Sequence, residues 1–129
     1  MAKKKSIENQ IREGLSAGEQ SDTIMLAIPS HDQQQVLLVN QGLWADDALA
    51  VFADLYGGAT AFQAYAGIYK STDGRHLRDN TIMVECLCNR DDAENPIKIR
   101  TLCDFCRRMK EETNQEAVML VVNNMMYFV

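Results

Sequence analysis

The sequence is poor in the residues and runs that mark several classes of protein. It has two histidines and two prolines in 129 residues. No apolar run comes near the roughly 18 residues that a membrane-spanning helix needs. The basic residues after Met1 lead into a polar stretch, without the apolar core of a secretory signal. We therefore expect a cytoplasmic protein with no membrane partner.

Positive charge is missing from a long part of the chain. Residues 13–69 contain no Lys or Arg, and the net charge of the whole chain is −5. An acidic chain repels phosphate backbones, so we expect no nucleic-acid partner. Most of the basic residues fall within residues 70–110, which leaves room there for one small anion site.

Catalytic signatures are also missing. The sequence has none of the motifs of phosphate loops, zinc proteases, serine hydrolases or calcium loops. Its glycine-rich turn, Gly57-Gly58-Ala59-Thr60-Ala61, follows a predicted helix, whereas phosphate-binding loops precede one. The leading interpretation is a non-catalytic binding or interaction module that acts as a homo-oligomer and uses no cofactor.

Hydrophobic spacing predicts one α+β domain over residues 23–129, with residues 1–22 as an appendage that holds a short helix. The predicted order is a ferredoxin-like β-α-β-β-α-β sandwich, in which two helices cover one face of an antiparallel sheet. Its predicted elements are a helix at 6–17, strands at 23–28, 36–39, 61–70, 77–88, 118–122 and 125–129, and core helices at 44–56 and from Pro96 onward.

The four cysteines form a C-x-C pair, Cys86 and Cys88, and a C-x-x-C pair, Cys103 and Cys106. Four thiolates would complete a structural zinc site. Both pairs nevertheless fall inside regular elements on apolar faces, where cysteine behaves as a small apolar residue. Buried free thiols are the favoured interpretation and we expect no metal, with zinc binding and a redox role as the alternatives.

Several stretches of the sequence match a known pattern. They are Gly57 to Ala61, Gly67-Ile68-Tyr69, the turn Asp73-Gly74, and Glu112-Thr113-Asn114-Gln115. With them, the part from Trp44 to Val122 resembles a family of small uncharacterised bacterial proteins. That family has no assigned activity, so the resemblance carries over no catalytic residues.

A small enzyme or ligand-binding protein is the alternative function. We expect its site near the hairpin turn at residues 71–74, where hydroxyl, imidazole and guanidinium groups would hold a small polar or anionic ligand. The candidate ligand-binding residues are Thr60, Tyr69, Arg75, His76, Arg78 and Asp79.

Two helices can cover only one face of the predicted sheet. We assume that Phe62, Ala64, Ala66 and Ile68 face the helices, which leaves an apolar patch on the other face. A homodimer is expected to bury this patch. In the competing hypothesis, the N-terminal segment or residues 125–129 fold over it within one chain. The expected interface residues are Tyr65, Tyr69, Met83 and Leu87.

Overall fold

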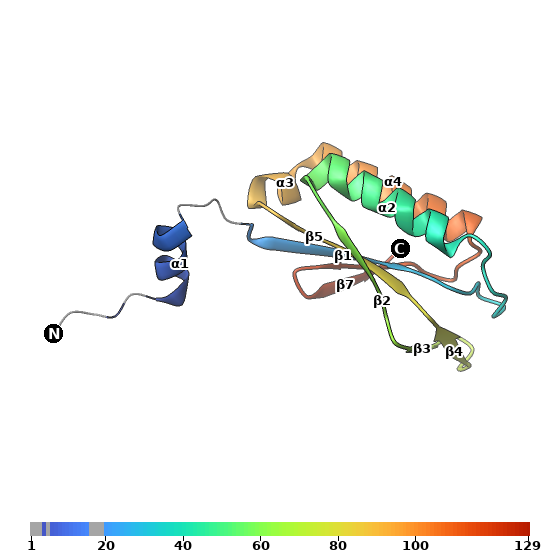
Figure 1. Ribbon diagram of the computed structural model, residues 1–129. Helices are drawn as coiled ribbons and strands as arrows, with labels where there is room; N and C mark the ends of the chain where they lie inside the picture. The colour runs from blue at the N-terminus through green and yellow to red at the C-terminus, as the bar shows by residue number, and fades with distance from the viewer. Residues whose placement is uncertain (1–3, 5, 16–19) are drawn as a thin grey trace.

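The computed structural model describes residues 4, 6–15 and 20–129 (Figure 1). It is an α+β protein with an antiparallel sheet, which confirms the predicted class. Two helices, α2 and α4, lie side by side over one face of the sheet (Figure 1). The helices are α1 (Ile7–Leu15), α2 (Gln41–Tyr56), α3 (Arg90–Glu94) and α4 (Pro96–Glu112).

The main sheet has five strands in the order β2-β5-β1-β6-β7. Every neighbouring pair in it is antiparallel. A separate two-stranded hairpin, β3–β4, leaves the sheet between β2 and β5. The strands are β1 (Asp22–Ile28), β2 (Thr60–Gln63), β3 (Gly67–Lys70), β4 (His76–Asp79), β5 (Ile82–Cys88), β6 (Met119–Val122) and β7 (Met125–Phe128). Within the described residues, no helix has both the length and the apolar character to cross a membrane.

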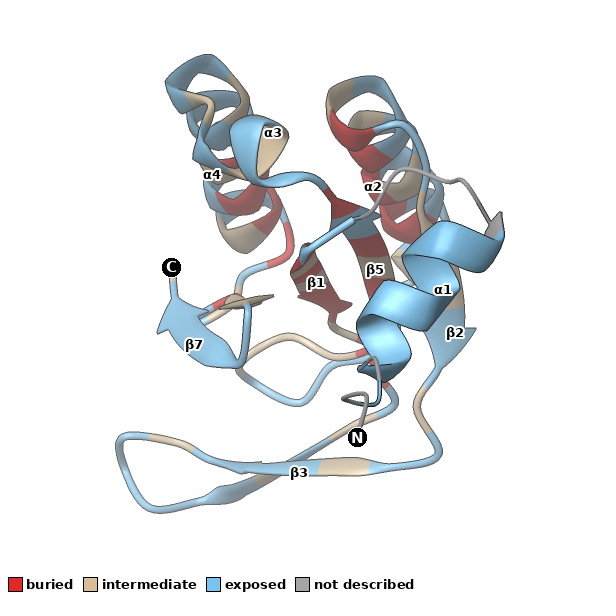
Figure 2. Ribbon diagram, turned by 90° about the vertical axis from the view of Figure 1, so that its left-hand side faces the viewer, coloured by how far each residue is buried: buried red, intermediate tan, exposed pale blue. Residues whose placement is uncertain are grey.

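The core lies between the helix pair and the sheet (Figure 2). Leu26 of β1 and Phe52 of α2 are fully buried in it. Side chains alternate along a strand, so Thr23 and Met25 of β1 lie on the opposite side of the sheet from Leu26. We call that side, which α2 and α4 leave uncovered, the open face (Figure 1).

Helix ends follow the residues that sequence reasoning identified. Gly57 ends α2 with φ of 93°, and its N–H donates to the carbonyl of Ala53 at 2.9 Å. A residue with a Cβ would be strained in this left-handed conformation. At the start of α4, the Asn95 side chain accepts hydrogen bonds from the N–H groups of Ile97 and Lys98, and Pro96 takes the first helical position.

The strand predicted at residues 36–39 is wrong. This segment is a loop in which Leu37 makes one isolated β-bridge with His31. The carboxylate of Asp32 accepts hydrogen bonds from the N–H groups of Gln34 and Val36 at 2.8 and 2.9 Å. These bonds close a tight turn, as aspartate side chains commonly do, and no strand is formed in the described residues between β1 and α2.

The two long strands predicted at 61–70 and 77–88 are each broken in two. The breaks fall at residues 64–66 and at Asn80-Thr81. There the side-chain amide of Gln63 donates to the carbonyls of Asn80 and Thr81 at 2.8 and 3.1 Å. The carbonyl of Thr81 also accepts the N–H of Ala64 at 2.8 Å. The backbone carbonyls at the break are therefore hydrogen-bonded where the hairpin turns away from the sheet.

Two predicted side-chain orientations are also wrong. Phe62 is 46% exposed and Ala61 packs against the core instead, so the phase of β2 is shifted by one residue. Such a shift moves every side chain to the other face. In α4, apolar spacing predicts an inward stripe that includes Ile99, Leu102 and Met109. Leu102 and Met109 are buried, but Ile99 is 42% exposed.

The C-terminal hairpin is confirmed. Asn123 and Asn124 have φ of 50° and 71°, which fits the two-residue turns that best match the twist of a β-hairpin. Asn123 also contacts the start of β1, because its side chain bonds to the carboxylate of Asp22 and to the N–H of Thr23. The bond from Asn123 is the largest cause that lowers the pKa of Asp22.

Leu102 tests the packing of α4 on the sheet, because its side chain is 3% exposed. We predict that Leu102→Ala lowers the free energy of unfolding by about 2–5 kcal/mol, through the cavity that it leaves. Urea denaturation measures this loss. Ile97→Ala is the matched control on the same helix, where the side chain is 70% exposed. A loss below about 0.5 kcal/mol for Leu102→Ala would contradict the packing.

Candidate functional site

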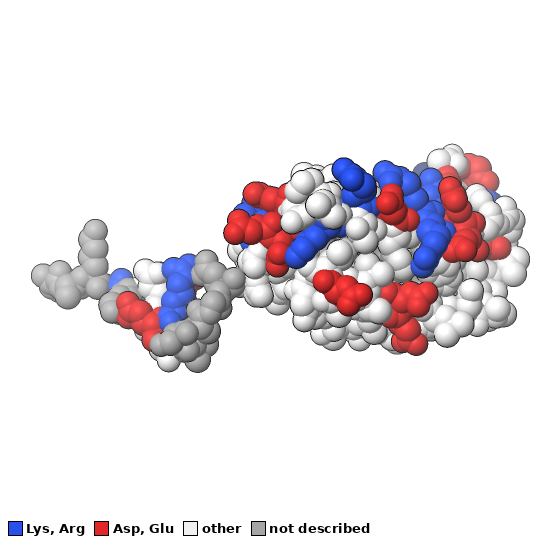
Figure 3. Space-filling view, turned by 90° about the horizontal axis from the view of Figure 1, so that it is seen from above, with Lys and Arg blue, Asp and Glu red and all other residues white. Residues whose placement is uncertain are grey.

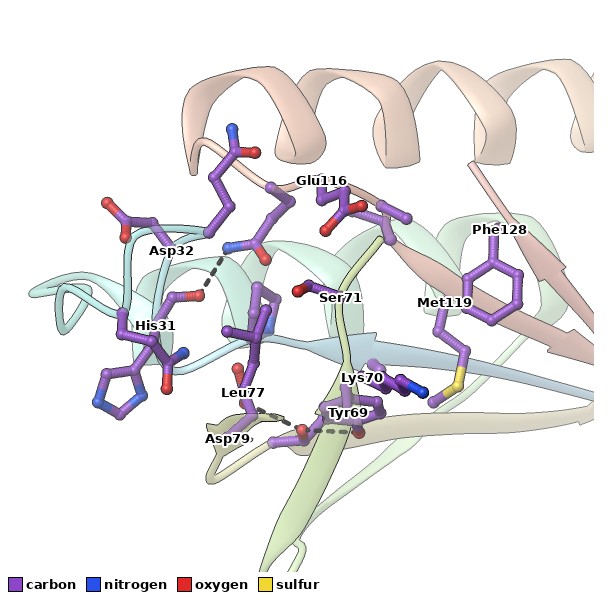
Figure 4. A pocket seen from close by; sticks show the side chains of 18 of the residues that line it. His31, Asp32, Tyr69, Lys70, Ser71, Leu77, Asp79, Glu116, Met119 and Phe128 are labelled. Carbon is purple, nitrogen blue, oxygen red and sulfur yellow. Dashed lines mark hydrogen bonds between the residues drawn. The ribbon is translucent and has the colours of Figure 1, made fainter. Parts of the chain in front are cut away.

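A cavity of about 520 Å³ lies where the β3–β4 hairpin meets one end of the main sheet. Three segments enclose it: the hairpin, the loop at 29–35, and residues 115–119, which lead into β6. Its lining includes Ala27, Met119 and Phe128, which come from three neighbouring strands of the sheet or their ends. We call this cavity the hairpin pocket (Figure 4).

A hydrogen-bonded carboxylate lies at the base of the hairpin. One oxygen of Asp79, Oδ1, accepts hydrogen bonds from the backbone N–H of Ser30 at 2.9 Å, from the Ser30 hydroxyl at 3.1 Å and from the Thr81 hydroxyl at 3.0 Å. Ser30 and Thr81 are 2% and 3% exposed. All three bonds reach the same oxygen, and within the described part of the chain the other oxygen, Oδ2, accepts no hydrogen bond.

The network extends on both sides of Asp79. The Tyr69 hydroxyl lies 3.4 Å from that of Thr81 (Figure 4). The Ser30 hydroxyl lies 2.7 Å from Nδ1 of His31 and also accepts a bond from the N–H of Asn80. Hydroxyl, imidazole and carboxylate groups are therefore joined in one chain beside the pocket. Serine lies between histidine and aspartate here, so this is not the order of a hydrolase triad.

The loop that carries His31 is held by the Glu112-Thr113-Asn114-Gln115 stretch. The Gln115 side chain donates to the carbonyl of His31 at 2.8 Å (Figure 4). Asn114 accepts from the backbone N–H of Gln33 at 3.0 Å and from its side-chain amide at 2.7 Å. The end of α4 thus fixes the opposite wall of the pocket.

The pocket combines an acidic side with an apolar end. Figure 4 shows Met119 and Phe128 at one end and His31 and Asp32 at the other. Hydrogen bonds from the N–H groups of Val36 and Gln34 lower the pKa of Asp32, with the bond from Val36 the largest cause, so Asp32 is charged at neutral pH. The charged side chains in the lining are Asp32, Lys70, Asp79 and Glu116.

Two of the six residues predicted for the ligand site, Tyr69 and Asp79, line the pocket. Arg75 lies at the hairpin tip, where its Nε pairs with Asp73 at 2.7 Å. His76 and Arg78 are exposed on β4, and the backbone N–H of Arg78 donates to the Gln35 side chain. Thr60 lines a different groove, at the other end of β5.

Sequence reasoning missed the acidic and loop residues of the pocket. The sequence around His31 and Asp32 predicts only a polar loop, and it assigns no role to Glu116. The sequence feature that could have pointed to these residues is the pair of amide-rich stretches at 33–35 and 114–115. Amide side chains in two segments can satisfy each other's backbone groups across a loop. Nothing in their spacing, however, showed that these segments meet.

The expected interface residues do not form one patch on the main sheet. Met83 and Leu87 lie on the open face of β5, where Leu87 is 54% exposed. Tyr65 is fully exposed in the connection between β2 and β3, and Tyr69 belongs to the hairpin. The structure adds other apolar side chains to the open face, namely Met25, Phe62, Met119, Val121, Met126 and Phe128.

Charges of both signs cover the outer surface of the helix pair. Figure 3 shows Lys and Arg side chains interspersed with Asp and Glu side chains over this face. They include the pairs Arg107–Asp104 and Arg108–Glu112 on α4. The face in this view therefore offers no continuous basic stripe of the kind that binds a nucleic-acid backbone.

Three cysteines lie in the protein core. Cys86, Cys88 and Cys106 are buried, and Cys103 is half-buried. Burial raises the pKa of the Cys86 and Cys106 thiols to about 12. Among the described residues, no three His, Cys, Asp or Glu side chains are grouped to hold a metal ion.

No protein-family model and no curated protein matches this chain. Two solved structures share its fold. One is a phage SAM lyase in complex with S-methyl-5'-thioadenosine, at a TM-score of 0.64 and 11% identity, over 87% of this chain and 91% of that one. The other is a phage SAM lyase in the apo state, at a TM-score of 0.59 and 11% identity, over 87% and 90% of the two chains. At this identity the likeness shows the fold alone.

Thiol reactivity tests the cysteine environment, because the thiolate is the reactive form. We predict that in native protein at pH 8 Cys103 reacts first with an aromatic disulfide reagent, while the three buried thiols react at least about tenfold more slowly. Denatured protein should release four equivalents. Cys103→Ser removes the fast phase. Stoichiometric zinc in protein purified without added metal would contradict the free-thiol interpretation.

Proposed function

We propose that the chain is a non-catalytic binding protein whose small-molecule ligand occupies the hairpin pocket. The observation that carries this proposal is the combination of a cavity of about 520 Å³ with a carboxylate fixed by two buried hydroxyl residues. Ligand pockets commonly have volumes of about 300–1,000 Å³ and combine an apolar lining with a few placed polar groups. Asp79 is such a group, since Ser30 and Thr81 hold it in one orientation.

The lining favours a ligand with an apolar part and a polar, hydrogen-donating or cationic part. Asp32, Asp79 and Glu116 contribute negative charge, and Lys70 contributes positive charge. Arg75 and Arg78, which motivated an anionic ligand, are absent from this lining. Adenine nucleosides with a thioether or sulfonium group fit that description. They are the first probes, because a phage SAM lyase of the same fold is in complex with S-methyl-5'-thioadenosine.

Asp79→Asn tests the site directly. An asparagine still has a side-chain oxygen to accept the bonds from Ser30 and Thr81, but it removes the charge. We predict that S-methyl-5'-thioadenosine or S-adenosylmethionine binds the wild type in calorimetry, and that Asp79→Asn weakens this binding about tenfold or more. Arg75→Ala, at the hairpin tip outside the pocket, should bind as the wild type does.

Two outcomes would contradict the proposed function. The first is the absence of binding by both probes up to millimolar concentration, with the variants folded by circular dichroism. The second is equal affinity of the wild type and Asp79→Asn for the probe, which would show that the ligand does not bind beside Asp79 in the hairpin pocket. Consumption of S-adenosylmethionine during the same incubation would overturn the non-catalytic part of the proposal.

We also propose that the core is ferredoxin-like. The strand order β2-β5-β1-β6, with α2 after β1 and α4 after β5, supports this description. In this description the β3–β4 hairpin and β7 are additions to the core, and the hairpin adds the wall of the pocket.

A homodimer is a second proposal, which the exposed apolar side chains of the open face support. Leu87 is 54% exposed and Phe62 is 46% exposed on this face. Contiguous apolar surface of more than a few hundred Å² commonly marks an interaction site. We propose a second copy as the partner, because most soluble oligomers are closed homo-oligomers and two-fold dimers are the commonest of them.

Leu87→Glu tests the homodimer. We predict that the wild type has the mass of a dimer in light scattering at micromolar concentration, and that Leu87→Glu shifts it to a monomer by placing a charge in the interface. Ile97→Glu is the control, because Ile97 is also exposed, at 70%, but lies on the helix layer. A wild-type monomer would rule out the dimer, and a dimer that survives Leu87→Glu would exclude this part of the open face.

A further inference from the structure

The N-terminal helix α1 exposes an apolar stripe. Ile7 and Ile11 are 72% and 53% exposed, although they lie four residues apart and therefore on one side of the helix. Ser6 begins the helix, and its hydroxyl accepts the N–H of Asn9 at 3.2 Å. The polar residues follow the other sides, so α1 has a face that is suited to packing on an apolar surface.

Such a short helix depends on packing for its stability. α1 has nine residues and includes Gly14, whereas isolated helices of fewer than about 12–15 residues are marginal in water. A glycine inside the helix costs about a further 1 kcal/mol relative to alanine. A tertiary or quaternary contact with Ile7 and Ile11 would provide the missing stabilisation.

The open face carries apolar side chains on which the apolar stripe of α1 could pack. Met25 of β1 pairs with Glu85 of β5 on one side and with Val121 of β6 on the other, and Val121 pairs with Met126. These residues form one row across four strands. Met25 and Val121 also line a groove on this face, and its other lining residues are polar: Ser21, Thr23, Glu85, Arg90, Asn123 and Asn124.

The two surfaces also match in size. A helix of nine residues is about 13 Å long at 1.5 Å per residue. Five strands spaced about 4.8 Å apart span roughly 19 Å between the outermost strands. The helix can therefore lie across the open face without reaching beyond the sheet.

We propose that α1 of one copy packs on the open face of a second copy, and that the two copies exchange these helices reciprocally. This inference rests on the proposed homodimer and names the segment that covers its open face. Figure 1 shows α1 standing to one side of its own domain, beyond the start of β1 and away from its own sheet. A helix in that place is available to a neighbour, and reciprocal exchange gives the self-complementary contact of a two-fold dimer.

Disulfide trapping between two different chains tests the exchange. One chain carries Ile11→Cys and the other carries Val121→Cys, and the two are mixed under mild oxidation. We expect a disulfide-linked dimer on a non-reducing gel, well above the background of each variant alone. Asn9→Cys, on the opposite side of α1, is the matched control and should link at least about fivefold less to Val121→Cys.

A second pair of variants separates this inference from the homodimer itself. Ile11→Asp should convert the dimer to a monomer in light scattering, whereas Asn9→Asp, which adds the same charge to the polar side, should leave a dimer. A dimer that survives Ile11→Asp would overturn the exchange and keep the homodimer. A wild-type monomer would overturn both proposals.

One more variant distinguishes α1 of the same chain from α1 of a second copy as the helix that covers the open face. It carries Ile11→Cys and Val121→Cys in the same chain. We expect linked dimers. A fast-migrating monomer with an internal disulfide would show that α1 covers its own sheet, and this outcome would overturn the exchange. The absence of any disulfide would show that α1 does not reach the open face at all.

Discussion

The hydrogen bonds of Asp79 determine where the second half of the sheet divides. Ser30 follows the central strand β1, and Thr81 precedes β5, so the carboxylate joins two strand ends that lie side by side. The amide of Gln63 bonds to the carbonyls of the same junction. Because these side chains satisfy the backbone there, β3 and β4 can leave the sheet as a separate hairpin. The pocket exists because the hairpin leaves the sheet at this point.

The close contact of Gly67 is a consequence of that departure. A Cβ on Gly67 would lie 3.1 Å from the carbonyl oxygen of Asp79 and 3.3 Å from the Tyr69 ring. The hairpin therefore turns back on its own aromatic side chain, and Tyr69 lies beside Thr81 at the wall of the pocket. The Gly67-Ile68-Tyr69 stretch, which sequence reasoning noted only as part of a resemblance, has a local steric role.

Local signals predicted α1, α2, α4 and the central strands, because their causes lie within a few residues, but they did not predict the short helix α3. Gly57 and Pro96 mark helix ends by backbone geometry, and a continuous apolar run marks the buried strand that holds Leu26. The same reasoning failed at β2, where an apolar pattern on both faces left the phase undetermined. Thr60-Ala61-Phe62 is compatible with either orientation, and only pairing with β5 selects one.

The pocket was harder to predict because its residues come from segments far apart in the sequence. Asp79 meets Ser30 across 49 positions, and Gln115 meets His31 across 84 positions. No periodicity connects such residues. Sequence reasoning predicted a site at this hairpin, and its candidates included Arg75 at the tip and Arg78 on β4, where charge is conspicuous. The structure instead brings together carboxylates and amides at the base of the hairpin.

The hairpin pocket and the open face share side chains of the main sheet. Met119 and Phe128 line the pocket and also belong to the apolar side of β6 and β7, beside Val121 and Met126. A ligand that fixes Phe128 therefore changes the edge of the surface on which we propose that a second copy packs. Any such coupling has to be reciprocal, since the free energy that links two binding events is the same in either order. The proposed ligand and the proposed partner thus meet at one pair of strands, β6 and β7, while the helix layer and the buried thiols lie on the other side of the sheet.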